Sequence, residues 1–196
     1  NLCFNWFSVA DTKRDQGEAM SIRQMIASVV AEHRIDERRI YITGLSAGGA
    51  MANAMLACYP EVFAGGAIIA GLPYAAASTV PQAFDRMRGQ GLPGTGSLQA
   101  SLRAASRHKG TWPTISVWQG TGDNTVVPEN AAAIIAQWRG VHAVPEQPSQ
   151  VETQKVRQAP GFLSKITCSA ISTQPIRYFS LADRQFFHIC QKPARC

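Results

Sequence analysis

The sequence predicts an α/β protein in which a mostly parallel sheet is flanked by helices. Runs of strand formers alternate with runs of helix formers along the chain, at 15–34, 39–43, 50–58, 63–71, 113–120 and 128–139. Strands joined through helices lie side by side in the same direction, so this alternation indicates a parallel sheet. The chain has 196 residues, of which 45% are apolar and 16% charged. These values fit one packed domain.

Charge and cysteine content exclude several classes of function. The 19 basic and 13 acidic residues give a net charge of +6. No basic run is interleaved with aromatic residues, so we expect no binding to nucleic acid. No apolar stretch is long enough to span a membrane, and residues 1–7 have neither the basic start nor the apolar core of a signal peptide. Five cysteines without a CxxC pair predict no metal site and define no disulfide framework.

The first predicted helix covers residues 15–34, where apolar residues recur at spacings of three and four. Asp15 and Glu18 have the spacing of a capping box at its start. His33 falls on the apolar face, so we expect a packed or capping histidine there. The strand at 39–43 follows, and its carboxyl end leads into a glycine-rich turn.

That turn, Gly44–Gly49, has the features of a serine nucleophile elbow. It joins a short strand to a helix of small residues at 50–58, and Ser46 stands at its centre. We expect Gly44 and Gly48 to keep neighbouring side chains away from this strained position. The backbone N–H of Ala47 would then stabilise the oxyanion of a tetrahedral intermediate. The alternative is an ordinary serine in a glycine-rich turn.

The next predicted elements are a buried strand at 63–71, whose glycines allow a helix to approach, and short helices at 80–88 and 97–105 that resemble a lid. Tyr74 follows the strand, where ligands of open α/β sheets bind. Together with Trp6 and Trp118 it is a candidate aromatic wall for an ester substrate, although aromatic residues are more often part of the core.

Asp123 is the candidate acid that orients a catalytic base. It lies in the loop after the strand at 113–120, at the same predicted sheet edge as Ser46. A turn-forming aspartate is the alternative interpretation. The helix that follows, at 128–139, is expected to end at Gly140.

Two histidines follow Asp123 in the chain. His142 comes directly after the helix, and we expect a solvated loop residue. His188 follows a predicted strand at 176–180 and is the candidate base, although the apolar residues around it equally suit a packed segment. Glycine becomes rare after about residue 150, so we divide the chain into a core at 1–152 and an atypical C-terminal segment at 153–196.

Several motifs in fixed order resemble the poly(3-hydroxybutyrate) depolymerase family of esterases, whose relatives include feruloyl esterases. The motifs are Cys3-Phe4-Asn5-Trp6-Phe7, Arg14-Asp15-Gln16-Gly17-Glu18, the elbow with Ala50-Met51, Tyr59-Pro60-Glu61-Val62-Phe63, Gly71-Leu72-Pro73-Tyr74, and Trp118-Gln119-Gly120 with Asp123. The resemblance implies an α/β-hydrolase fold with Ser46 as nucleophile and Asp123 as acid. It also implies an exported (extracellular or periplasmic) enzyme that needs no cofactor and hydrolyses polyhydroxyalkanoate or hydroxycinnamoyl esters.

The chain departs from this family at both ends. The family has an upstream His-Gly-Cys type loop that supplies a second oxyanion donor, so the resemblance implies that the chain starts inside the domain. The Gly-Met-Gly-His type loop that carries the family's histidine has no match in residues 153–196. The expected function is therefore a serine esterase, and the alternative is a catalytically inert homologue that acts as a binding or remnant protein.

Overall fold

A computed structural model describes residues 3–147, 152–157, 163–170 and 176–181. The elements in chain order are α1 (Val9–Thr12), α2 (Gly17–Glu32), the 3-10 turn η1 (Glu37–Arg39), β1 (Tyr41–Leu45), α3 (Ala47–Cys58), β2 (Gly65–Ile69), α4 (Val80–Met87), α5 (Thr95–Ala104), β3 (Thr114–Gly120), α6 (Glu129–His142), β4 (Glu152–Arg157), β5 (Leu163–Ala170) and β6 (Ile176–Leu181). No helix in these ranges is long and apolar enough to cross a membrane.

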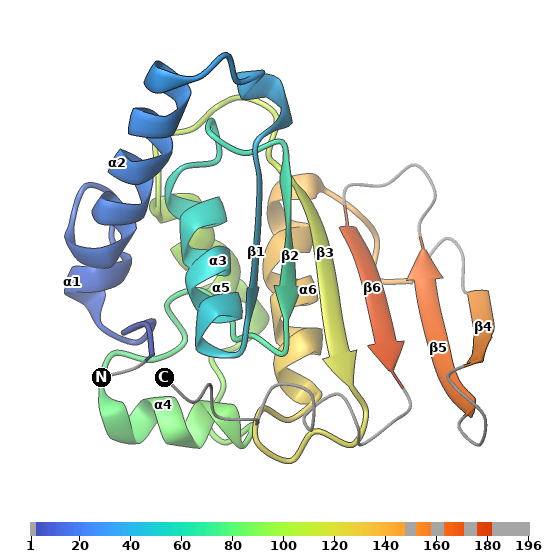
Figure 1. Cartoon of the computed structure of the whole chain (residues 1–196). Coiled ribbons are helices and arrows are strands. Elements are labelled where there is room, and N and C mark those ends of the chain that lie inside the picture. Colours follow the sequence, from blue (N-terminus) through green and yellow to red (C-terminus); the bar gives the residue numbers. More distant parts are fainter. Residues whose placement is uncertain (1–2, 148–151, 158–162, 171–175, 182–196) are drawn as a thin grey trace, which may run out of the picture.

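The strands form one sheet in the order β1-β2-β3-β6-β5-β4 (Figure 1). The first four strands in this order are parallel, which confirms the predicted α/β class, whereas β5 and β4 are added antiparallel. Leu45 pairs with Ile69, and Ile69 pairs with Trp118. The carboxyl ends of β1, β2 and β3 therefore meet at one edge. The sheet continues through β4, β5 and β6, beyond the boundary predicted at residue 152.

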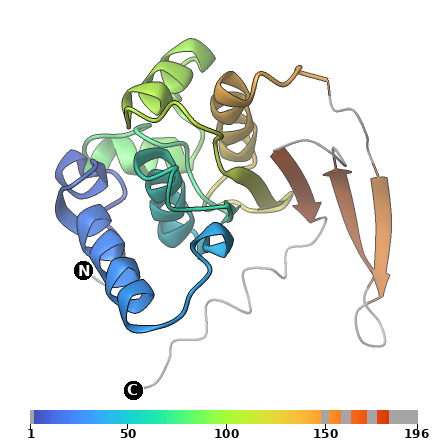
Figure 2. The ribbon, with the colours of Figure 1, turned by 90° about the horizontal axis from the view of Figure 1, so that it is seen from above.

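One face of the sheet forms the core with α3 and α6 (Figure 2). Ile68 of β2 and Val117 of β3 are almost fully buried against Met55 of α3. The strand β2 can approach α3 closely because it carries Gly66, where an added methyl group would lie 2.7 Å from Leu56 Cδ1. This confirms the close helix approach that the glycines of the strand predicted.

The opposite face of the four parallel strands is covered by none of the described helices (Figures 1 and 2). Tyr41 on β1 is 65% exposed, and Thr114 on β3 is also exposed. The indole of Trp118 stacks on the ring of Phe179 across β3 and β6, with ring centroids 3.9 Å apart. This face thus combines hydroxyl groups with aromatic rings.

The predicted capping box at the start of α2 is wrong. The N-cap is Gln16, which makes no side-chain capping bond. Asp15 is instead held outside the helix, where its N–H donates to the Tyr59 hydroxyl over 2.7 Å. Glu18 turns away from the helix terminus to accept hydrogen bonds from Asn5. Contacts distant in sequence have therefore replaced the local cap.

The predicted end of the last helix at Gly140 is also wrong, because α6 continues to His142. Gly140 serves packing instead. A methyl group there would lie 2.6 Å from Gln99 Cγ, so glycine allows α5 to lie close to α6. Ala143 ends the helix in the left-handed conformation, with φ 52°.

Candidate active site

Ser46 occupies a strained turn between β1 and α3. Its φ of 55° and ψ of −119° lie in a region that serine rarely adopts. The turn is fixed on both sides: the Ser46 N–H donates to the Ile69 carbonyl over 2.9 Å, and the Ser46 carbonyl accepts from the Ala50 N–H over 2.9 Å. Backbone strain of this kind persists only where the surroundings over-determine it. The local structure has the strand–turn–helix geometry of a nucleophile elbow.

Two glycines make this turn possible. A methyl group on Gly44 would overlap the Gly48 carbonyl, and one on Gly49 would lie 2.7 Å from the Ile69 carbonyl oxygen. Gly44 is therefore required as predicted. Gly48 is not required for clearance, because a methyl group there would meet only Phe4 Cδ2, at 4.0 Å. Gly49, which the sequence pattern did not single out, takes that role.

A cavity of about 530 Å³ opens beside the elbow. Its lining comprises Leu45, Ser46, Ala47 and Gly48 from the elbow, with Cys3, Phe4 and Glu18 from the N-terminal segment and α2. Ala47 is the first residue of α3, so its N–H has no acceptor within the helix. An oxygen in the cavity can therefore receive a hydrogen bond from the helix terminus, as the oxyanion prediction for Ala47 requires.

Asp123 lies in the loop after β3, at the sheet edge where β1 delivers Ser46. It is 7% exposed. Its Oδ1 accepts the backbone N–H groups of Thr125 and Val126, over 2.9 and 3.0 Å. The aspartate therefore shapes its own turn, as the alternative interpretation stated, and it also lies at the edge that the acid role requires.

The second carboxylate oxygen of Asp123 is held by Gln119, a residue that the sequence pattern did not assign to the site. Gln119 Nε2 donates to Asp123 Oδ2 over 3.2 Å and to the Val126 carbonyl over 2.8 Å. Gln119 is 2% exposed, and its Oε1 has no hydrogen-bond partner among the described residues. The sequence offered one signal: a glutamine near the end of a predicted buried strand needs a hydrogen-bond partner close by.

The described histidines lie away from Ser46. His33 follows α2 and precedes β1 in the chain. His108 lies just before β3, and its Nε2 forms a hydrogen bond with the Thr111 carbonyl. His142 ends α6 at that same side of the sheet, near Pro113. All three therefore lie at the end of the sheet where β1 and β3 begin, opposite the end at which Ser46 follows β1. His188 lies outside the described residues; it follows β6, whose carboxyl end reaches the edge of Ser46.

His142 is not the solvated loop residue that was expected. Its ring is half-buried and stacks on Trp138, with centroids 5.9 Å apart. Burial lowers the pKa of His142 to about 4, although a hydrogen bond to the Pro113 backbone opposes this. The side chain is therefore neutral at pH 7 and belongs to the packing between α6 and the start of β3.

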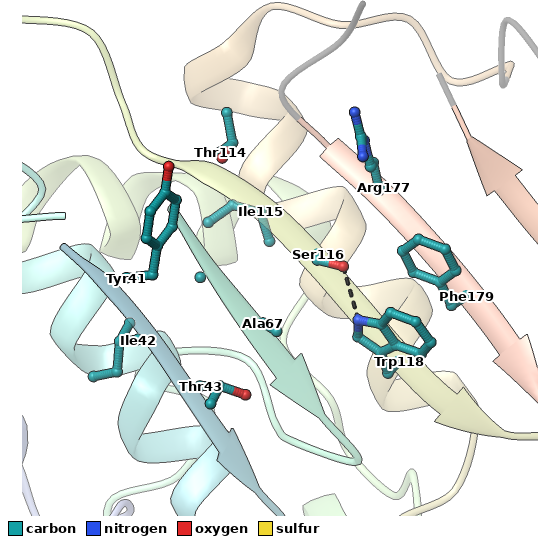
Figure 3. Close-up of a pocket in the computed structure, with 11 residues that line it drawn as sticks. Tyr41, Ile42, Thr43, Ala67, Thr114, Ile115, Ser116, Trp118, Arg177 and Phe179 are labelled. Atoms are coloured by element: carbon teal, nitrogen blue, oxygen red, sulfur yellow. Dashed lines mark hydrogen bonds between the residues drawn. The ribbon is translucent and has the colours of Figure 1, made fainter. Parts of the chain in front are cut away.

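The cavity beside Ser46 is lined by none of the three predicted substrate-wall residues, Trp6, Tyr74 and Trp118. Tyr74 is 9% exposed, and its hydroxyl lies 3.7 Å from the Cys58 sulfur. Burial raises the pKa of Tyr74, and this residue belongs to the core. Trp118 lines a different cavity, of about 500 Å³, on the sheet face without described helices (Figure 3). Its Nε1 donates to Ser116 Oγ over 2.8 Å.

Residues 1–146 match the sequence profile of the family described as esterase PHB depolymerase. The chain belongs to this family. A relative from Paucimonas lemoignei, poly(3-hydroxyalkanoate) depolymerase C, is 39% identical over 92% of this chain and 43% of its own length. Feruloyl esterase B of Neurospora crassa is 33% identical over 71% of this chain and 52% of its own length. The chain thus spans about half the length of these relatives.

One solved structure supports the fold of this family member. The acetyl xylan esterase from Aspergillus awamori superposes with a TM-score of 0.76 and 22% sequence identity, over 91% of this chain and 66% of that protein. This similarity shows an α/β-hydrolase fold.

Proposed function

We propose that this chain is a serine carboxylic-ester hydrolase that acts through an acyl-enzyme. The observation that carries the proposal is the strained conformation of Ser46, at φ 55°, in a chain of an esterase family. The cost of such a conformation is about 1–3 kcal/mol, and a turn without chemistry would be filled by glycine at no such cost. The open cavity beside Ser46 gives an ester access to the hydroxyl.

In the proposed reaction, Ser46 Oγ attacks the ester carbonyl while His188 removes its proton. The Ala47 N–H stabilises the negative oxygen that forms. The bond between the carbonyl carbon and the alcohol oxygen then breaks, and the alcohol leaves with the proton from the histidine. Water attacks the acyl-enzyme, passes one proton to the histidine, and releases the carboxylic acid as Ser46 regains its proton.

Asp123 would orient the histidine in this scheme. Its Oδ1 already accepts two backbone N–H groups, so Oδ2 is the oxygen with capacity left for an imidazole N–H. Holding the imidazole in one tautomer keeps its other nitrogen available as the base. Asp123 follows β3 and His188 follows β6, and these two strands are neighbours in the sheet.

The names of the relatives suggest the substrate class. They include a poly(3-hydroxyalkanoate) depolymerase, feruloyl esterases and acetylxylan esterases. We therefore propose polyhydroxyalkanoate oligomers or hydroxycinnamoyl esters as substrates of this chain. Export from the cell is part of the same proposal and follows from the family resemblance.

A fluorophosphonate probe tests the nucleophile directly. We expect it to label Ser46, and we expect Ser46→Ala to abolish both labelling and hydrolysis of 4-nitrophenyl acetate. Ser21→Ala is the matched control, because Ser21 lies on the exposed surface of α2. Full activity in the Ser46→Ala variant would refute the proposed function. His188→Ala should lower kcat by about three orders of magnitude or more.

The position of the described histidines favours one other candidate function, an inert homologue that binds esters without cleaving them. His33, His108 and His142 all lie at the edge opposite Ser46. If His188→Ala retains the activity of the wild-type chain, His188 is not the base. A folded chain that does not react with the fluorophosphonate probe would support the inert homologue.

A further inference from the structure

The cavity beside Ser46 is completed by a segment that precedes every helix of the structure. Phe4 and Cys3 come from this segment, and Glu18 comes from the first turn of α2. They line the cavity together with the elbow, although they stand about 30 to 40 residues before it in the sequence. The elbow therefore forms only one side of the space that a substrate would enter.

Phe4 lies beside the first turn of α3, and both line the cavity that contains Ser46. A methyl group added to Gly48 would lie 4.0 Å from Phe4 Cδ2 and would meet no other atom within 4 Å. Phe4 is 43% exposed. Because Gly48 has no side chain, the exposed part of Phe4 stays open to the cavity that contains Ser46. An apolar group attached to an ester at Ser46 can pack against an exposed aromatic side chain that lines the same cavity.

Phe4 is held in place by its neighbours. The Asn5 N–H donates to Glu18 Oε2 over 2.8 Å, and Asn5 Nδ2 donates to Glu18 Oε1 over 3.4 Å. Trp6 is 8% exposed and packs in a small apolar cluster with Ala50 of α3. The segment is thus fixed to α2 by a carboxylate and to α3 by an indole. A preformed wall loses little conformational entropy when a ligand binds.

We propose that Phe4 is the aromatic wall that contacts the acyl group of the ester, and that Asn5 and Glu18 are positioning residues for it. The inference rests on the proposed function, because it places the acyl carbon at Ser46. The acyl group stays attached to Ser46 during both chemical steps, so an aromatic side chain that lines the same cavity as Ser46 can contact this part of the substrate. Acyl groups with several apolar carbons, or with a flat ring, gain this contact, whereas an acetyl group is too short to cover the ring.

A series of 4-nitrophenyl esters tests the role of Phe4, because its members share one alcohol and differ only in the acyl chain. We expect Phe4→Ala to lower kcat/KM for the hexanoate about tenfold relative to that for the acetate. Glu18→Gln should change this ratio in the same direction by a smaller factor, because it weakens the hold on Asn5. Phe4→Tyr should restore the wild-type ratio, since it keeps the ring.

Phe84→Ala is the matched control. Phe84 is a phenylalanine of α4 that is 53% exposed and does not line the cavity beside Ser46. It should leave the hexanoate-to-acetate ratio unchanged. An equal loss for every acyl chain in Phe4→Ala would overturn the inference while leaving the serine esterase intact. An effect of Phe4→Ala that varies only with the alcohol part of the ester would overturn it as well.

A binding measurement separates the inference from the proposed function. In the Ser46→Ala background, the affinity for 4-nitrophenyl hexanoate can be measured by ligand-observed NMR without turnover. We expect Phe4→Ala to weaken this binding about tenfold and Phe84→Ala to leave it unchanged. If the wild-type chain does not hydrolyse esters, the proposed hydrolase is refuted. Weaker binding in Phe4→Ala would still support Phe4 as the aromatic wall. If Phe4→Ala leaves the affinity unchanged, Phe4 is not the aromatic wall.

Discussion

Gln119 Nε2 donates a hydrogen bond to Asp123 Oδ2 over 3.2 Å, and both side chains are buried where β3 ends. Oδ2 is also the oxygen that the proposed mechanism assigns to the histidine. The glutamine therefore restricts the direction in which the carboxylate can face. Its own Oε1 has no hydrogen-bond partner among the described residues.

Gln119→Met should reduce kcat about tenfold with little change in KM, because the carboxylate loses the hydrogen bond that orients it. Gln137→Met is the matched control. Gln137 is equally buried, but it bonds only to the backbone of Tyr74 and Leu98. Steady-state kinetics and urea unfolding of both variants separate orientation from stability. A comparable loss of kcat in the two variants would show that burial alone matters.

Gly44→Ala and Gly48→Ala should have opposite effects on stability. A methyl group on Gly44 would lie 2.8 Å from the Gly49 nitrogen and overlap the Gly48 carbonyl, so we expect a loss of about 3 kcal/mol or more. Gly48→Ala meets open space within a helix, where alanine is favoured by up to about 1 kcal/mol. Its methyl group enters the cavity and should lower activity. Urea unfolding measures both, and equal destabilisation would contradict the assigned geometry.

The Cys58 thiol should be unreactive in the folded protein. Burial raises its pKa to about 11, and the thiol bonds to the Thr12 carbonyl over 3.1 Å. At pH 8 only about a thousandth of it is thiolate. Cys3 is exposed and should react freely. Alkylation followed by peptide mass spectrometry should show Cys58 protected until urea unfolds the chain, and labelling of Cys58 at the rate of Cys3 would disprove its burial.

His142 should make stability fall as the pH drops from about 6.5 towards 4. Its pKa is about 4 in the folded chain and near 6.5 when unfolded, so within this window only the unfolded state takes up the proton. Protonation then favours unfolding, with a slope of at most about 1 kcal/mol per pH unit for a partly exposed group. Urea unfolding at pH 5 and pH 7 should show a smaller difference in His142→Gln. An unchanged difference would assign the pH dependence to other groups.

The sequence predicted the elements that depend on local patterns. The strands that became β1, β2 and β3 and the helix after Ser46 all follow runs with clear periodicity or composition. The elbow could be predicted because its chemistry requires residues that are adjacent in the chain. The predicted strand near 176–180 is also confirmed, as β6 (Ile176–Leu181) beside β3.

Features that depend on distant partners could not be predicted in the same way. Glu18 looked like a helix cap, but Asn5 competes for its carboxylate. Gly140 looked like a helix end, but the contact with Gln99 determines its role. Tyr74 follows a strand at the active edge, yet burial beside Cys58 takes it into the core. In each case tertiary packing prevailed over the local pattern.

At Ser46 the residue that the reaction requires is less stable than glycine would be in the same backbone conformation. Glycine adopts a φ of 55° without penalty, so Ser46→Gly should stabilise the fold while removing the nucleophile. Variants sorted only for resistance to unfolding would therefore accumulate glycine at position 46. Variants sorted for ester cleavage would keep serine there.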